Sequence, residues 1–218
     1  MPHITLIRHG QANSMAKDEA SYDQLSPLGY QQARWLGEPM QATQDHFQRI
    51  YAGTLQRQVE TARAMAGDTA EITQDARLNE LSYFTMATLM ETQHGLAMPA
   101  TREAYVSHLP KVFGAWMRDE IDGVPERYAD FESRVSDALD EIAAGRGRAV
   151  VVTSGGVISL VMARILGLDV AGWSQIALAI QNTSVHRLHL IQDRPMVAQF
   201  NAVPHLEHPD RHHAQTHL

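Results

Sequence analysis

A short apolar run in the second half of the chain most constrains its fold. Residues 149–153 read Ala-Val-Val-Val-Thr, with no charged side chain. A continuous run rich in β-branched residues is typical of a strand buried on both faces, as occurs where helices cover both sides of a parallel sheet. Strand and helix patterns alternate along much of the chain, so the sequence predicts an α/β protein.

Apolar periodicity, turn residues and helix caps predict the other elements. We expect strands near residues 4–7, 49–52, 71–74, 184–191 and 196–202, and helices at about 27–40, 55–66, 127–144 and 157–166. Ser26 and Pro27 have the residue types of an N-cap and a first helical position. Residues 11–25 are predicted to form a polar loop.

Residues 83–145 differ from the rest because their pattern is helical and contains no convincing strand. Four residues are expected to break this region into helices: Gly95, Pro99, Pro110 and Pro125. We interpret the chain as a single domain over 1–204 with an inserted helical cap at about 83–130. Residues 205–218 form a polar tail in this interpretation. Its histidines are irregularly spaced, which favours a solvated tail over a metal site.

Composition narrows the classes of function. The chain has 218 residues, a formal net charge of -7 and no cysteine, which excludes disulfides and thiolate chemistry. An acidic chain is a poor match for nucleic acid, because binding to the phosphate backbone needs a basic surface. No apolar run approaches the roughly 20 residues that span a bilayer. We expect a cytoplasmic protein with no membrane association, and the sequence leaves open whether it forms a homodimer.

Arg8 and His9 stand side by side where the first strand ends, and Gly10 follows them. The carboxyl ends of strands are where open α/β sheets bind ligands. A guanidinium can hold two phosphoryl oxygens in bidentate fashion, and a neutral imidazole can attack phosphorus. We expect Gly10 to supply a turn with positive φ. A surface Arg-His pair without a catalytic role is the alternative.

Two more charged residues follow strands in the same way. Arg57 lies in the first turn of the helix after the 49–52 strand, where it and the backbone amides are suited to an anion. Glu80 follows the third strand, where it is suited to protonate a leaving alcohol or to orient a water molecule. The alternatives are a solvated helix arginine and an exposed or ion-paired glutamate.

These motifs, in this order, resemble the histidine phosphatase superfamily, which includes cofactor-independent phosphatases and the cofactor-dependent phosphoglycerate mutases. The resemblance rests on Arg8-His9-Gly10, on residues 23–29 (Asp-Gln-Leu-Ser-Pro-Leu-Gly), and on residues 55–57 with Thr61-Ala62. It covers about the first eighty residues and resumes near residue 155. It implies a three-layer α/β/α fold and a covalent phosphohistidine on His9. It also implies a phosphate clamp of Arg8 and Arg57, with Glu80 as the proton donor.

The chain departs from the family pattern at Ser154, where relatives usually carry a second histidine. A serine hydroxyl is shorter, neutral and a weaker donor, and loss of one preorganised donor typically costs on the order of 10²–10³ in rate. Ser154 and the amides of Gly155 and Gly156 are expected to contact a phosphoryl oxygen. The alternative is that Ser154 is a simple turn residue. His186 is a weaker candidate for replacing the missing imidazole.

The residues around the expected site bear on the substrate. Gln11, directly after the Arg8-His9-Gly10 turn, joins the expected substrate-binding residues, and no metal or cofactor is expected. The cap at 83–130 is acidic on balance, with aromatic and thioether side chains: Tyr83, Phe84, Met86, Met90 and Met98. A mutase for phosphoglycerates needs extra cations, so this cap favours a phosphatase over a mutase, and a substrate whose non-phosphate part is not strongly anionic. The alternative is that these side chains form the core of the cap.

The leading hypothesis is therefore a metal-independent phosphomonoester hydrolase acting on a small phosphorylated substrate or a phosphoprotein. One alternative is a catalytically impaired member of the fold that binds phosphate or a phosphoprotein. The other is a phosphotransferase of the phosphoglycerate mutase type.

Overall fold

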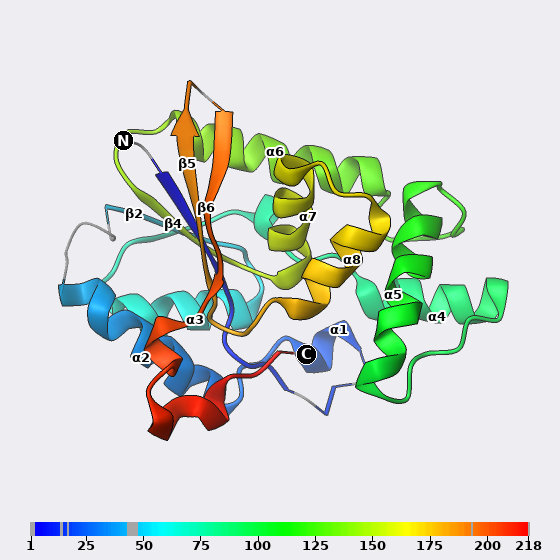
Figure 1. Ribbon diagram of the computed structural model, residues 1–218, viewed down its shortest axis with the longest axis horizontal. Helices are drawn as coiled ribbons and strands as arrows, with labels where there is room; N and C mark the ends of the chain where they lie inside the picture. The colour runs from blue at the N-terminus through cyan, green and yellow to red at the C-terminus, as the bar shows by residue number, and fades with distance from the viewer. Residues whose placement is uncertain (1–2, 14, 17, 43–47, 193, 218) are drawn as a thin grey trace.

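The computed structural model describes residues 3–13, 15–16, 18–42, 48–192 and 194–217. Within them one six-stranded sheet has the strand order β3-β2-β4-β1-β5-β6 (Figure 1). The strands are β1 (His3–Arg8), β2 (Arg49–Ala52), β3 (Ile72–Gln74), β4 (Ala149–Thr153), β5 (Val185–Ile191) and β6 (Arg194–Ala202). The first four are mutually parallel, β5 is antiparallel to β1, and β6 is antiparallel to β5. The predicted mixed, mostly parallel sheet is confirmed.

Helices cover both faces of the sheet, with α2 and α3 on one side and α6 and α7 on the other (Figure 1). The α-helices are α1 (Glu19–Tyr22), α2 (Pro27–Ala42), α3 (Gln56–Ala66), α4 (Tyr83–His94), α5 (Arg102–Met117), α6 (Tyr128–Ala144), α7 (Gly155–Leu166) and α8 (Val170–Ala179). Short 3₁₀ helices occupy Ala76–Leu78, Pro204–Leu206 and Pro209–Ala214. The three-layer α/β/α architecture is confirmed.

The two central strands, β1 and β4, supply apolar side chains to both layers. Leu6 and Val151 pack on the side of α6 and α7, whereas Ile7, Val150 and Val152 pack on the side of α2 and α3. All five side chains are buried. Successive strand residues point to opposite faces, so an uninterrupted apolar run is what a strand between two helical layers requires.

The register of the parallel strands brings three strand ends together. Arg8 pairs with Thr153 across β1 and β4, and Ala52 pairs with Val152 across β2 and β4. The residues that follow each strand therefore meet at one edge of the sheet. This edge is the expected place for a ligand site in an open α/β fold.

The prediction of a loop over residues 11–25 is wrong in part, because α1 lies within it. Asp18 caps this helix, and its Oδ1 accepts a hydrogen bond of 2.7 Å from the Ser21 amide. The helix has only one turn and buries no residue, so it leaves no apolar periodicity in the sequence.

Pro110 was expected to break the cap, but it lies inside α5. Proline removes one backbone donor from a helix interior, which is unfavourable by itself. The buried side chains of Leu109, Val112 and Phe113 on the same helix offset that cost through packing. Gly95 ends α4 with a φ of 67°, as glycine often does, so that break is confirmed. That α4 and α5 belong to a cap inserted in a single domain stays a prediction.

The segment after Pro204 is not the solvated tail that its composition suggested. His205 is buried, and its Nε2 lies 2.9 Å from the Thr183 hydroxyl. Leu206 and Ala214 are also buried, in a small cluster with two side chains of α2, Leu28 and Trp35. These few apolar residues hold a histidine-rich segment against the domain, which composition alone does not reveal.

Among the described residues, no helix combines the length and the apolar character needed to cross a membrane.

Close packing of α2 on α3 yields a stability prediction at Gly37. A Cβ atom there would lie 2.2 Å from the carbonyl oxygen of Met65 in α3, so Gly37→Ala must push the helices apart. We expect a loss of about 1–3 kcal/mol in the free energy of unfolding, measured by urea denaturation. Gly114→Ala is the matched control, because a Cβ there meets only the flexible tip of Arg118. Equal stability of wild type and Gly37→Ala would contradict this account of the interface.

Candidate active site

The turn after β1 is held by hydrogen bonds to two other elements, the strand β4 and the helix α3. The His9 amide donates to the Thr153 carbonyl of β4 at 2.9 Å, and the Gly10 amide donates to the Thr61 hydroxyl of α3 at 2.9 Å. Gly10 does not have the positive φ that was expected. It is required for another reason, because a Cβ at this position would lie 2.4 Å from the Gly29 carbonyl oxygen.

His9 is buried in this turn, and its ring has a defined orientation. Its Nδ1 lies 2.7 Å from the Gly10 carbonyl oxygen, which only accepts hydrogen bonds, so Nδ1 carries the proton. Nε2 is then the atom with the lone pair, and it accepts a hydrogen bond of 3.3 Å from Arg57 Nε. Burial lowers the pKa of His9 well below its ordinary value, and the charges of Arg57 and Arg8 lower it further. The ring is therefore neutral and nucleophilic at Nε2.

Arg57 reaches His9 from the first turn of α3, and its position depends on Asp23. The Asp23 carboxylate accepts hydrogen bonds from the amides of Gln56 and Arg57 at 2.9 and 3.1 Å, and from Arg57 Nη1 at 3.0 Å. The helix N-terminus is therefore occupied by a protein carboxylate, and the predicted anion site at those amides is wrong. The Arg57 guanidinium also lies 4.9 Å from the centre of the Tyr22 ring, which orients it further.

Arg8 is almost fully buried and retains an unused donor. One terminal nitrogen donates to the Ile180 carbonyl. Its Nε is buried and has no hydrogen-bond partner among the described residues. Leaving a buried donor unpaired is unfavourable, and an anion in the adjacent pocket would satisfy it.

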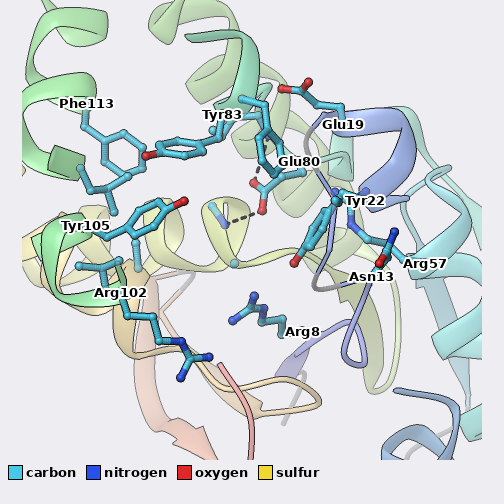
Figure 2. A pocket seen from close by; sticks show the side chains of 18 residues that line it. Arg8, Asn13, Glu19, Tyr22, Arg57, Glu80, Tyr83, Arg102, Tyr105 and Phe113 are labelled. Atoms are coloured by element: carbon cyan, nitrogen blue, oxygen red, sulfur yellow. Dashed lines mark hydrogen bonds between the residues drawn. The ribbon is translucent and has the colours of Figure 1, made fainter. Parts of the chain in front are cut away.

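Glu80 lies in the loop after the 3₁₀ helix Ala76–Leu78, lines the same pocket as the two arginines, and contacts the start of α7. Its Oε2 accepts a hydrogen bond of 3.0 Å from the Gly156 amide, and its Oε1 accepts one of 3.1 Å from the Leu81 amide. It is therefore neither ion-paired nor a fully exposed glutamate. Figure 2 shows the Glu80 carboxylate directed into the pocket, across from Arg8.

Ser154 does not line the pocket, which differs from the role expected of it. The side chain is fully buried, and its Oγ accepts a hydrogen bond of 2.8 Å from Gln58 Nε2. Gln58 is itself fully buried on α3 and also donates to the Leu78 carbonyl at 3.3 Å. The position where the resemblance implies a second histidine is thus closed by a serine-glutamine pair. Gly155 and Gly156, by contrast, do line the pocket.

Gln11 and His186 lie outside the pocket lining. The Gln11 Oε1 atom accepts a hydrogen bond of 2.8 Å from the Ser26 hydroxyl, which ties it to the start of α2. His186 is buried in β5, where its Nε2 lies 2.9 Å from the Ser184 hydroxyl and its Nδ1 accepts from the Asn201 amide. His186 therefore has its own structural partners and does not replace the missing imidazole.

A hydrogen-bond network not evident from the sequence supports the turn from beneath. Asn182 donates from Nδ2 to the His9 carbonyl at 3.3 Å and accepts from the Thr216 hydroxyl at 2.9 Å. Gln32 donates to that same hydroxyl and accepts from the Gln11 amide at 2.8 Å. The chain segment near its C-terminus thus braces the turn that holds His9. Asparagine, threonine and glutamine at scattered positions carry no sequence signal for this role.

The pocket above these residues has a volume of about 350 Å³. Arg8, Arg57 and Glu80 line one end of it, and side chains of α1, α4 and α5 line the other (Figure 2). Those outer side chains include Glu19, Tyr22, Tyr83, Phe84, Arg102, Tyr105 and Phe113. The described residues contain no group of three or more histidine, aspartate or glutamate side chains arranged to hold a metal ion.

Comparisons with known proteins identify relatives of this chain. The sequence profile of the histidine phosphatase superfamily, branch 1, matches residues 4–203. No curated protein sequence matches the chain.

Solved structures share the fold at low sequence identity. A phosphoserine phosphatase variant from Entamoeba histolytica, in complex with phosphoserine, superposes with a TM-score of 0.70 at 21% identity, covering 94% of this chain and 100% of that one. A mycobacterial glucosyl-3-phosphoglycerate phosphatase has a TM-score of 0.64 at 23% identity, covering 92% and 98%. A phosphoglycerate mutase from Bacillus anthracis has a TM-score of 0.68 at 20% identity, covering 93% and 94%.

The buried histidine of β5 generates a prediction about pH. Burial, with a smaller effect of the Arg8 charge, lowers the pKa of His186 to about 3, whereas an unfolded histidine titrates near 6.5. As the pH falls below 6.5, the unfolded chain takes up a proton on this histidine while the folded protein does not, which lowers the free energy of unfolding. The contribution of neutral His186 to that free energy is therefore complete above pH 6.5 and is lost as the pH falls towards 3. Between pH 6.5 and pH 5, His186 lowers the free energy of unfolding by about 2 kcal/mol.

Urea denaturation of wild type and His186→Gln between pH 8 and pH 5 measures this effect. The two free energies of unfolding are expected to differ by a constant amount at pH 7.5–8 and to converge as the pH falls. Parallel curves down to pH 5 would show that His186 binds its proton as readily in the folded protein as in the unfolded chain, which would contradict a lowered pKa.

Proposed function

The chain belongs to branch 1 of the histidine phosphatase superfamily, and from this premise we propose that it is a metal-independent phosphomonoester hydrolase. The observation that carries the proposal is the state of His9, a buried neutral imidazole whose Nε2 accepts a hydrogen bond from Arg57 and whose pKa is lowered by burial and by the charges of Arg57 and Arg8. An imidazole fixed through Nδ1 is suited to attack phosphorus with Nε2. Arg8 and Arg57 supply the positive charge that a phosphoryl group needs as it is transferred.

The proposed reaction has two steps. In the first, the lone pair of His9 Nε2 forms a bond to phosphorus while the bond from phosphorus to the ester oxygen breaks. Arg57 Nε turns from Nε2 to a phosphoryl oxygen, and the unused Arg8 Nε binds another. Glu80 in its acid form gives its proton to the departing alkoxide, which leaves as the alcohol.

In the second step, water attacks the phosphohistidine. The Glu80 carboxylate accepts a proton from the water as its oxygen bonds to phosphorus, and the bond between phosphorus and Nε2 breaks. The electron pair returns to Nε2, phosphate leaves, and both side chains regain their starting states. The substrate of this reaction is a small phosphorylated molecule or a phosphoprotein.

The pocket favours hydrolysis over a mutase reaction. A mutase acting on phosphoglycerates must bind a carboxylate and a second phosphate in addition to the transferred group. Beyond Arg8 and Arg57, Arg102 is the one cationic residue among the described side chains that line the pocket. A cytoplasmic location and the absence of a metal requirement remain predictions from the sequence.

The Ser154-Gln58 pair favours a second candidate, a phosphate-binding protein with little turnover. On the side of the site where Ser154 and Gln58 lie, the pair supplies neither an imidazole nor a charged group to bind phosphate. Such a protein would bind phosphate or a phosphoprotein through the same two arginines without releasing it quickly.

Hydrolysis of p-nitrophenyl phosphate in the presence of EDTA tests the enzyme hypothesis. We expect wild-type turnover and a loss of at least ~10³-fold in His9→Ala, since the nucleophile is removed. The exposed His212→Ala serves as the control and is expected to keep wild-type activity. Wild type rapidly quenched with substrate is expected to carry an acid-labile, alkali-stable phosphoryl group that His9→Ala lacks. If wild type and His9→Ala are equally inert over pH 5–8 but bind phosphate, the binding candidate replaces the hydrolase.

Because Ser154 is buried against Gln58, the effect of placing a histidine at position 154 can be tested with and without Gln58. Because Gln58 fills the space next to Ser154, Ser154→His alone is expected to destabilise the fold by about 1–3 kcal/mol and to give no gain in rate. Ser154→His combined with Gln58→Ala makes room for the ring and is expected to raise kcat above that of Gln58→Ala alone. Thermal unfolding and kcat of the three variants measure this. A higher kcat for Ser154→His alone than for wild type would show that Gln58 does not occupy the space that the histidine ring needs.

A further inference from the structure

Aromatic rings form a continuous wall that leads from His9 into the outer part of the pocket. The Tyr22 ring lies 6.1 Å from the His9 ring, and Phe84 lies 6.1 Å from Tyr22. Tyr83 then lies 6.2 Å from Phe84, and Tyr105 lies 6.1 Å from Tyr83, all measured between ring centroids. We call Tyr22, Phe84, Tyr83 and Tyr105 the aromatic wall. Figure 2 shows Tyr22 and Tyr105 on opposite sides of the pocket, with Arg8 at its base.

The aromatic wall lies at the edge of the hydrophobic core of this region, and only Tyr83 of its four residues packs against the described core. Its four side chains are only half-buried and border the pocket. The core between α4 and the rest of the protein is formed instead by fully buried residues of that helix, among them Met86 and Met90. Half-buried rings facing a pocket are suited to contact a ligand, because their apolar faces remain partly open to solvent.

Contacts from outside the pocket hold the wall in position. The Tyr83 hydroxyl lies 2.9 Å from Nδ1 of the buried His108. Glu19, next to the wall in α1, accepts hydrogen bonds from the Thr85 amide and hydroxyl at 2.9 and 3.4 Å, which joins α1 to α4. Tyr83 is therefore held by a hydrogen bond, and Tyr22 by its contact with the Arg57 guanidinium, so these two rings need little ordering when a ligand binds.

The outer end of the pocket has one charged side chain of each sign, so it carries no excess of either charge. Both Glu19 oxygens accept hydrogen bonds from Thr85, and Arg102 donates to the His217 carbonyl at the outer rim. The two remaining cations, Arg8 and Arg57, lie beside His9, where the phosphoryl group is expected. The outer pocket consequently offers ring faces and aliphatic side chains, with hydroxyl groups at their margins.

We propose that the site takes a phosphomonoester whose alcohol carries an uncharged, flat aromatic ring, held by the aromatic wall. The proposal rests on the proposed function, since it assigns the leaving group of that reaction. The pocket volume of about 350 Å³ is ample for one or two fused rings, since a cavity of about 150 Å³ already holds benzene.

Four phosphate esters of alkyl alcohols test the proposal: benzyl phosphate, ethyl phosphate, 3-phosphoglycerate and phosphocholine. Beyond the carbon that bears the phosphate, benzyl phosphate carries an aromatic ring, ethyl phosphate only a methyl group, 3-phosphoglycerate an anion and phosphocholine a cation. None of the four has the activated leaving group of an aryl ester. We expect kcat/KM for benzyl phosphate to exceed each of the others by about 10-fold or more. A higher value for 3-phosphoglycerate or phosphocholine would overturn the proposal.

Variants of the aromatic wall test whether it produces the expected preference for benzyl phosphate over ethyl phosphate. Tyr105→Leu removes a ring at a half-buried position and is expected to reduce the ratio of benzyl to ethyl phosphate kcat/KM by about 5–10-fold. Tyr105→Phe keeps the ring and is expected to keep the ratio, as is Val106→Ala at the exposed neighbouring position. Phe84→Leu provides a second test should Tyr105→Leu fail to fold by circular dichroism. An equal loss for both esters in Tyr105→Leu and Phe84→Leu would overturn the role of the wall.

Binding measurements separate failure of this proposal from failure of the hydrolase. If wild type hydrolyses none of the esters, the proposed reaction is wrong, but the ligand class is still measured by calorimetry with benzylphosphonate and methylphosphonate. At least ~10-fold tighter binding of benzylphosphonate, lost in Tyr105→Leu, would support the aromatic ligand. Equal affinities would overturn it whether or not the protein is an enzyme.

Discussion

The parallel pairing of β1 with β4 at the centre of the sheet is the constraint on which the site depends. It places Arg8 opposite Thr153, so the turn holding His9 and the turn starting α7 leave the sheet at the same edge. The amide of His9 then bonds to the Thr153 carbonyl, which extends the pairing by one residue beyond the strand. Both strands are buried on both faces, and a register shift would reverse the faces of every side chain in them. The geometry around His9 is therefore as rigid as the core of the sheet.

Two buried arginines beside a buried histidine give the site an excess of positive charge. Burying charge is costly unless it is paired, and among the described residues Asp23 pairs with Arg57 and no carboxylate pairs with Arg8. Arg8 keeps a carbonyl contact and a buried Nε that has no partner in the described part of the chain. Burial and the charges of both arginines keep His9 neutral, since they disfavour its protonated form. In the reaction proposed above, the phosphoryl group supplies the anion that Arg8 lacks and leaves Nε2 free to react.

Between α3 and α7, the position where the resemblance implies a second histidine holds Ser154, and Gln58 donates a hydrogen bond to the Ser154 hydroxyl. This packed contact closes that side of the site. The pocket instead extends outward, towards rings contributed by α1, α4 and α5. Its outer end is thus built by helices with little role in the sheet, and its inner end by residues that follow the strands.

The sequence by itself determined the layers and predicted three residues that the structure brings to one pocket. The run 149–153 predicted a doubly buried strand, and the strand-end positions of Arg8, Arg57 and Glu80 predicted their meeting, because strand ends in parallel sheets converge. Tertiary structure alone decided how those residues are held. Asp23 at the start of α3, Gln58 against Ser154, and Thr216 beneath His9 make contacts between segments far apart in the chain. Periodicity and local motifs report on neighbours within a few residues, whereas these partners were selected by packing across the whole domain.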